Sequence, residues 1–157
     1  MSRDAGFADG AARALRLRAF DMDDLAVVSA LVQDAVLSSA DMRWQKEQRR
    51  FALLLNRYRW EDNERAARAN DHERVRAMLV IEDVERVQSA GLPQEGDFVL
   101  SLLSLAWEPG EDGAGRLILT FAGDGAIAVT VEALEVLLQD VTRPYPAPSR
   151  HAPGHDV

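Results

Sequence analysis

The sequence predicts a single α+β domain in which antiparallel strands predominate. The chain has 157 residues, the size of one ordinary domain. Most of it alternates apolar and polar residues over short segments, which is the period of a strand, and turn-forming glycines separate these segments. Two segments, residues 21–37 and 131–141, repeat apolar residues with the period of a helix instead. Strands at such short spacing indicate antiparallel pairing.

The chain begins its predicted structure with one strand and one helix. Residues 15–20 alternate apolar and basic side chains, so we expect a short amphipathic strand there. Residues 21–37 follow as a helix, because Asp21 is a good N-cap and an apolar stripe includes Val28 and Val32.

A series of strands follows the helix. Residues 49–60 are apolar on both faces at their middle, which indicates a central strand. Residues 61–73 are polar and highly charged and predict a loop, and Gly123, Asp124 and Gly125 predict a tight hairpin. We expect strands over residues 42–48, 49–60, 74–82, 83–90, 97–107, 117–121 and 127–131.

The predicted elements end with a helix over residues 131–141, whose stripe is Leu134, Leu137, Leu138 and Val141. The expected architecture is a bent antiparallel sheet or partly open barrel with this C-terminal helix plugging one end, which is pleckstrin-homology-like. The alternative is a flat antiparallel sheet with both helices on one face. Residues 14–141 form the predicted domain, and residues 1–13 and the proline-rich residues 142–157 are expected to be disordered tails.

Composition restricts the classes of partner and the compartment. The formal net charge of −8 opposes binding to nucleic acid. No cysteine is present, which excludes disulfides and thiolate chemistry. No apolar run reaches the roughly 18–20 residues of a membrane span, and the N-terminal residues lack the pattern of a signal peptide. We therefore expect a cytoplasmic protein without a membrane or nucleic-acid partner.

Catalytic and metal-binding motifs are missing from the sequence. The three histidines are His72, in the charged loop, and His151 and His155, in the predicted tail, so no pair of ordered histidines is expected. No nucleophile elbow, phosphate-binding loop or calcium-binding loop occurs. The sequence consequently predicts no catalytic residue, no metal site and no cofactor, and it favours a protein that is not an enzyme.

The segment RRFALLLNRYRWE, residues 49–61, is the most unusual in the chain. Arginine and tryptophan dominate the energetics of protein interfaces, and arginine also binds carboxylates and phosphates. One interpretation is therefore a recognition edge, and the other is a core strand whose ends extend to the rim. The candidate binding residues are Arg49, Arg57, Tyr58, Arg59 and Trp60.

Three strings, LRLRAFDMDDLAVVSALVQDAVL, RRFALLLNRYRWE and LVIEDVERVQSAGL, carry a resemblance to a known family. Across residues 14–141 the chain resembles an uncharacterised alphaproteobacterial family, domain of unknown function 2948. The resemblance implies no activity, cofactor or site residue.

Three functions are consistent with these observations. The first is a non-enzymatic binding or adaptor domain that recognises a protein segment or an anionic small molecule. The second is a small enzyme or regulatory subunit that uses carboxylates and arginine. The third is a structural homo-oligomer, such as a homodimer, in which apolar strands like residues 97–107 cover one another.

Overall fold

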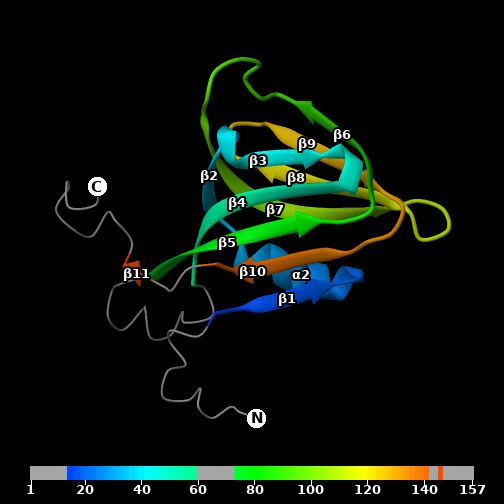
Figure 1. Ribbon diagram of the computed structural model, residues 1–157, viewed down its shortest axis with the longest axis horizontal. Helices are drawn as coiled ribbons and strands as arrows, with labels where there is room; N and C mark the ends of the chain where they lie inside the picture. The colour runs from blue at the N-terminus through cyan, green and yellow to red at the C-terminus, as the bar shows by residue number, and fades with distance from the viewer. Residues whose placement is uncertain (1–13, 60–72, 142–144, 147–157) are drawn as a thin grey trace, which may run out of the picture.

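A computed structural model of the chain describes residues 14–59, 73–141 and 145–146 (Figure 1). The predicted N-terminal tail, residues 61–72 of the predicted loop and most of the predicted C-terminal tail lie outside these residues. The elements are β1 (Arg16–Ala19), α2 (Met22–Leu31), β2 (Ala35–Ser38), η2 (Ser39–Asp41), β3 (Met42–Gln45), η3 (Lys46–Gln48), β4 (Arg50–Tyr58), β5 (Glu73–Ile81), β6 (Val84–Ala90), β7 (Val99–Pro109), β8 (Gly115–Phe121), β9 (Ala126–Val131), β10 (Val136–Asp140) and β11 (Tyr145–Pro146).

The strands form one antiparallel sheet of 11 strands. Its main path runs β1-β10-β5-β4-β2-β7-β8-β9-β6, while β3 pairs with β4 and β11 pairs with β5. The α+β class expected from the sequence is confirmed, as are the strands predicted between residues 42 and 131, apart from shifts at their ends.

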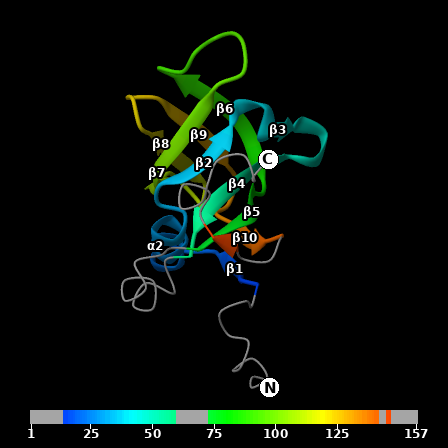
Figure 2. The same ribbon diagram turned by 90° about the vertical axis from the view of Figure 1, so that its left-hand side faces the viewer.

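The sheet bends sharply where β5 continues into β6. These two strands lie far apart along the path of the sheet, although only Glu82 and Asp83 separate them in the chain. Asp83 has a φ of 57°, which turns the chain, and the corner is held by backbone hydrogen bonds such as Glu82 N to Glu135 O at 3.0 Å. The sheet is nevertheless not closed into a barrel (Figure 2).

One hydrophobic core fills the concave side of the bent sheet. Its side chains come from alternate positions of the strands, for example Leu53, Leu79 and Leu119, all of which are fully buried. The helix α2 packs against β7 and β1 and buries Leu25 and Val28 in this core.

The helix predicted over residues 21–37 is shorter in the structure. Its N-terminus agrees with the prediction, since the Asp21 carboxylate accepts a hydrogen bond from Asp24 N at 2.8 Å. The helix ends at Leu31, because Asp34 takes a φ of 65° and the following residues pair with β7 as strand β2.

The prediction of a C-terminal helix over residues 131–141 was wrong. Residues Val136–Asp140 form strand β10, which lies between β1 and β5 and pairs with both. Val136 and Leu138 are fully buried on its core side, whereas Leu137 is half-buried on the other side. Leu137 is partly covered by its neighbours on the outer side, so apolar residues occupy adjacent positions of β10, and over so short a window this pattern resembles a helical stripe.

The absence of that helix affects both expected architectures. Without it, the pleckstrin-homology-like arrangement is not confirmed, because its C-terminal helix is a strand here. The flat sheet with two helices on one face also fails, since α2 is the only α-helix in the described residues and the sheet is bent.

Candidate functional site: an arginine-rich outer face and an adjoining cleft

The structure separates the four described residues of the binding set predicted from the sequence. Arg49 lies at the start of β4 with a left-handed φ of 56°, whereas Arg57, Tyr58 and Arg59 lie at its other end. The nine residues of β4 that lie between Arg49 and Arg59 span roughly 30 Å of extended chain. Trp60 lies outside the described residues.

Arg49 is exposed and forms an ion pair across the corner of the sheet. Its Nη2 lies 2.9 Å from Glu132 Oε1. The hydrogen bond to Glu132 raises the pKa of Arg49 above its usual value, and the nearby carboxylates of Asp83 and Glu85 act in the same direction. The pair joins the start of β4 to the chain after β9.

Arg57 is fully buried and forms a bidentate ion pair with Asp140 of β10. The Nε–Oδ1 distance is 3.0 Å and the Nη2–Oδ2 distance is 3.1 Å. Arg57 Nη1 also donates to the carbonyl of Tyr58 at 3.1 Å, and Asp140 Oδ2 accepts from Leu15 N at 2.9 Å. Both partners are buried, so this pair links β4 to β10 inside the fold and presents no charge to a ligand.

The side chains of Tyr58 and Arg59 occupy opposite sides of the sheet. Arg59 is buried, on the same side as Arg57. Tyr58 is half-buried and accepts a hydrogen bond from Arg74 Nη2 at 2.9 Å, and the Arg74 guanidinium lies 4.6 Å from the centre of its ring. The described members of the predicted set therefore do not form one exposed recognition edge.

A different group of arginines lies on the convex side of the sheet, which we call the outer face. Cross-strand partners point to the same side of a sheet. One row of such partners runs from Arg43 through Ala52, Val80 and Leu137 to Arg18, and it crosses β3, β4, β5, β10 and β1. The row therefore has an apolar middle and an arginine at each end.

The neighbouring rows repeat this arrangement. The next runs from Leu54 through Met78 and Gln139 to Arg16, and two further pairs are Asn56 with Arg76 and Tyr58 with Arg74. Arg50 stands at the other end of β4, opposite Gln45. The arginine face is thus formed by Arg16, Arg18, Arg43, Arg50, Arg74 and Arg76 around the apolar residues Ala52, Leu54, Met78, Val80 and Leu137.

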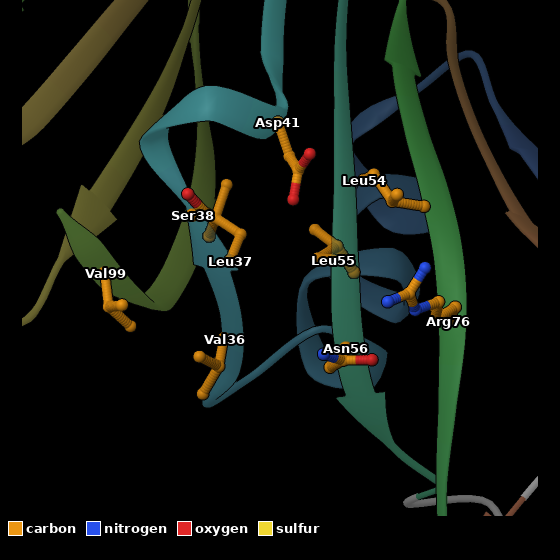
Figure 3. A pocket seen from close by; sticks show the side chains of 9 residues that line it. All are labelled: Val36, Leu37, Ser38, Asp41, Leu54, Leu55, Asn56, Arg76 and Val99. Carbon is orange, nitrogen blue, oxygen red and sulfur yellow. The ribbon is translucent and has the colours of Figure 1, made fainter. Parts of the chain in front are cut away.

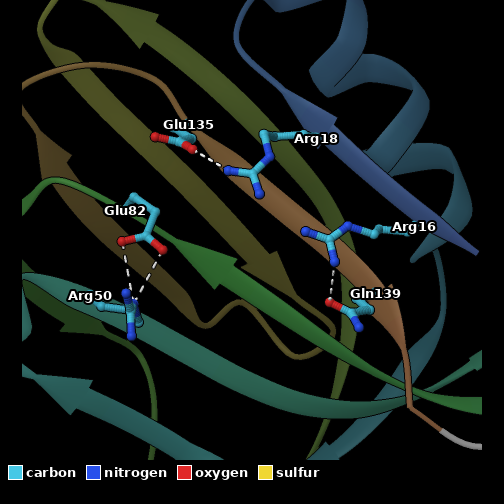
Figure 4. A network of polar contacts seen from close by, with 6 residues as sticks. All are labelled: Arg16, Arg18, Arg50, Glu82, Glu135 and Gln139. Atoms are coloured by element: carbon cyan, nitrogen blue, oxygen red, sulfur yellow. Dashed lines mark hydrogen bonds and ion pairs between the residues drawn. The ribbon is translucent and has the colours of Figure 1, made fainter.

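Three polar contacts hold arginines of this face in place (Figure 4). Arg50 Nε lies 3.2 Å from Glu82 Oε2, and Arg18 forms an ion pair with Glu135. Arg16 donates to Gln139 at 3.3 Å. Among the described residues, the face has six arginines, together with Glu82, Glu135 and, at its margin, Asp41, so basic groups outnumber acidic ones there although the whole chain has a net charge of −8.

A cleft of about 230 Å³ adjoins the arginine face between β2 and β4 (Figure 3). Val36, Leu54 and Val99 contribute its apolar walls. Arg76 lies on its β5 side, and Asp41 projects into it from η2. The cleft therefore combines apolar surface with one cation and one anion.

The outer face combines arginines with apolar side chains and offers no evident place for a metal ion among the described residues. The described residues contain no group of three histidine, aspartate or glutamate side chains that could hold a metal ion. Arginines around an apolar centre instead match the composition of protein interfaces.

The sequence contains a signal for this face that the prediction did not use. Arginines alternate with core residues in Arg16–Ala19 and again at Arg74 and Arg76 of β5. Each alternation indicates a strand with a basic outer side. Only the pairing of β1, β10 and β5 shows that the two basic sides belong to one surface.

The fold and this surface define an antiparallel α+β domain with an arginine-rich outer face. The model of a family described as protein of unknown function DUF2948 matches residues 15–155, and the chain belongs to this family. No curated protein and no solved structure matches it. None of the helices within the described ranges has the length and apolar character needed to cross a membrane.

Proposed function

We propose that the protein is a non-enzymatic binding domain whose arginine face receives an acidic segment of a partner protein. The observation that carries the proposal is the concentration of positive charge on one side of an acidic chain. Outside the arginine face, acidic residues outnumber basic ones in the described chain. An acidic segment would therefore be attracted to this face and repelled by the others.

The chemistry of the face favours a peptide over nucleic acid. Glu82 and Glu135 lie among the arginines and would repel a continuous phosphate backbone. The middle of the face is aliphatic, so it offers no row of aromatic rings on which bases could stack. Aliphatic side chains between carboxylates would instead contact Leu54, Met78 and Val80, while the carboxylates pair with the arginine rim.

A binding assay with a matched control tests the proposal. Random 12-residue peptides are displayed and selected on the full chain, and the affinity of the enriched peptides is measured by fluorescence anisotropy. We expect acidic peptides that contain aliphatic residues, with affinities that fall as salt rises. The double variant Arg16→Gln, Arg43→Gln removes two exposed arginines from the face, whereas Arg86→Gln, Arg116→Gln removes two exposed arginines from β6 and β8.

The two variants change the net charge equally, so a difference between them reports position. Exposed ion pairs contribute about 0.2–1 kcal/mol each, which for two arginines corresponds to a loss of roughly twofold to thirtyfold. We expect this loss in the first variant and less than a twofold change in the second. Equal losses in both variants, a selection without acidic peptides, or tighter binding of a single-stranded oligonucleotide would contradict the proposal.

A further inference from the structure

We infer that the cleft between β2 and β4 receives one apolar side chain of the bound acidic segment, and that Arg76 pairs with a carboxylate next to that side chain. The inference rests on the proposed function, because it makes the cleft beside the arginine face the feature that distinguishes one acidic segment from another. It follows from how the cleft forms, from its size and from the placement of its charges.

The cleft is a consequence of strand register. Strand β2 shares one register pair with β4, Val36 with Asn56, and β3 resumes pairing at Met42 with Leu53. Five residues, 37–41, lie between these pairs on one side, whereas only two residues of β4, Leu54 and Leu55, lie between them on the other. The longer segment bows outward through η2, and the sheet is left with a hollow that reaches the core residues Leu37 and Leu55.

The size of the hollow fits a side chain. Its volume of about 230 Å³ is below the roughly 300–1,000 Å³ of sites for drug-sized molecules and cofactors. Its walls include Val36 and Val99, and Val99 is 73% exposed at the edge of β7. A partner's aliphatic or aromatic side chain would cover Val99 and fill the space between β2 and β4, and burial of that apolar surface would favour binding.

The charges at the cleft give the bound segment a direction. Arg76 and its cross-strand partner Asn56 lie on the β5 side, and both side chains bear hydrogen-bond donors. Asp41 lies on the η2 side and repels a carboxylate placed there (Figure 3). A segment with an apolar residue in the hollow is therefore expected to place its adjacent carboxylate toward Arg76, which is also where the arginine face begins.

The test uses the acidic peptide that binds the full chain most tightly in the selection described above. Val99→Trp fills the mouth of the cleft, and Leu103→Trp, on the same strand but outside the cleft, is the matched control, since both residues are exposed. We expect Val99→Trp to weaken peptide binding at least tenfold and Leu103→Trp to change it less than twofold. Circular dichroism and thermal unfolding verify that both variants fold.

A double-mutant cycle tests the pairing with Arg76. Arg76→Gln is combined with replacement of each peptide Glu or Asp by its amide. We expect the two changes to be coupled for one carboxylate, the one adjacent to an apolar residue. For that carboxylate, the double change should weaken binding by a factor at least threefold smaller than the product of the two single factors. The side-chain amide of Asn56 provides a second readout, because its NMR resonances should shift when the peptide binds.

The outcomes separate the two proposals. If Val99→Trp and Arg76→Gln leave the affinity within twofold while Arg16→Gln, Arg43→Gln reduces it, the arginine face binds the segment and the assignment of the cleft is wrong. If no acidic peptide binds the full chain, the proposed function fails and the assignment of the cleft fails with it.

Discussion

Arg57 and Asp140 form a fully buried, bidentate ion pair that joins β4 to β10, with Nε–Oδ1 and Nη2–Oδ2 distances of 3.0 and 3.1 Å. The same carboxylate accepts a hydrogen bond from Leu15 N, and Asp140 N donates to Leu15 O, both at 2.9 Å. One charged pair therefore connects three strands of the half of the sheet that carries the arginine face.

Replacing Arg57 by Met should destabilise the protein strongly. The variant leaves the Asp140 carboxylate buried without its cation, and loss of one partner from a buried pair costs about 3–5 kcal/mol. Urea unfolding followed by circular dichroism measures the change in the free energy of unfolding.

The exposed pair Arg116–Glu108 supplies the control for this prediction. Arg116→Gln should cost less than about 1 kcal/mol, as is typical of surface pairs. A loss for Arg57→Met that is no larger than the loss for Arg116→Gln would show that the buried pair does not hold these strands together.

The adjacent residues Leu137 and Leu138 test whether residues 136–140 form a strand. Leu138 is fully buried in the core, whereas Leu137 is half-buried on the outer face. Leu138→Ala should therefore cost about 2–5 kcal/mol in unfolding free energy, and Leu137→Ala clearly less. Equal losses would be contrary to the alternation that the strand requires.

Gly115 begins β8 at a point where the chain has no room for a side chain. A Cβ atom there would lie 2.4 Å from the carbonyl oxygen of Glu108 and 2.7 Å from the Trp107 ring. We expect Gly115→Ala to destabilise the protein by about 1–3 kcal/mol, because the hairpin backbone must shift.

Gly110 lies in the same hairpin and serves as the comparison, because its nearest contact would be 3.1 Å away. Thermal unfolding of Gly115→Ala and Gly110→Ala compares the two positions. A variant of Gly115 as stable as the variant of Gly110 would argue against the close packing of β7 and β8 at this point.

Local signals in the sequence predicted much of the fold. The N-cap at Asp21 and the alternation along β4 and β5 depend on neighbouring residues, so they are visible before any tertiary structure. The C-terminal strand was not predictable in this way. Val136–Asp140 is a strand because β1 and β5 pair with its two edges, and those strands are distant in the chain.

The candidate site depends even more than the fold on contacts between residues that are distant in the sequence. Arg57 was selected for its residue type, yet its partner Asp140 lies 83 positions away and converts it into a buried structural residue. Conversely, Arg16 and Arg76 come to lie on one side of the sheet through the order β1-β10-β5. The cleft depends on the register between β2 and β4, a relationship that no short window of sequence contains.

The most direct test of the arginine face is an NMR titration of the ¹⁵N-labelled full chain with the selected acidic peptide. We expect the perturbed backbone amides to lie on β1, β10, β5, β4 and β3, and amides of β6, β8 and β9 to change little. Perturbations concentrated on β6, β8 and β9 or on α2, with the resonances of the arginine face unchanged, would contradict this expectation.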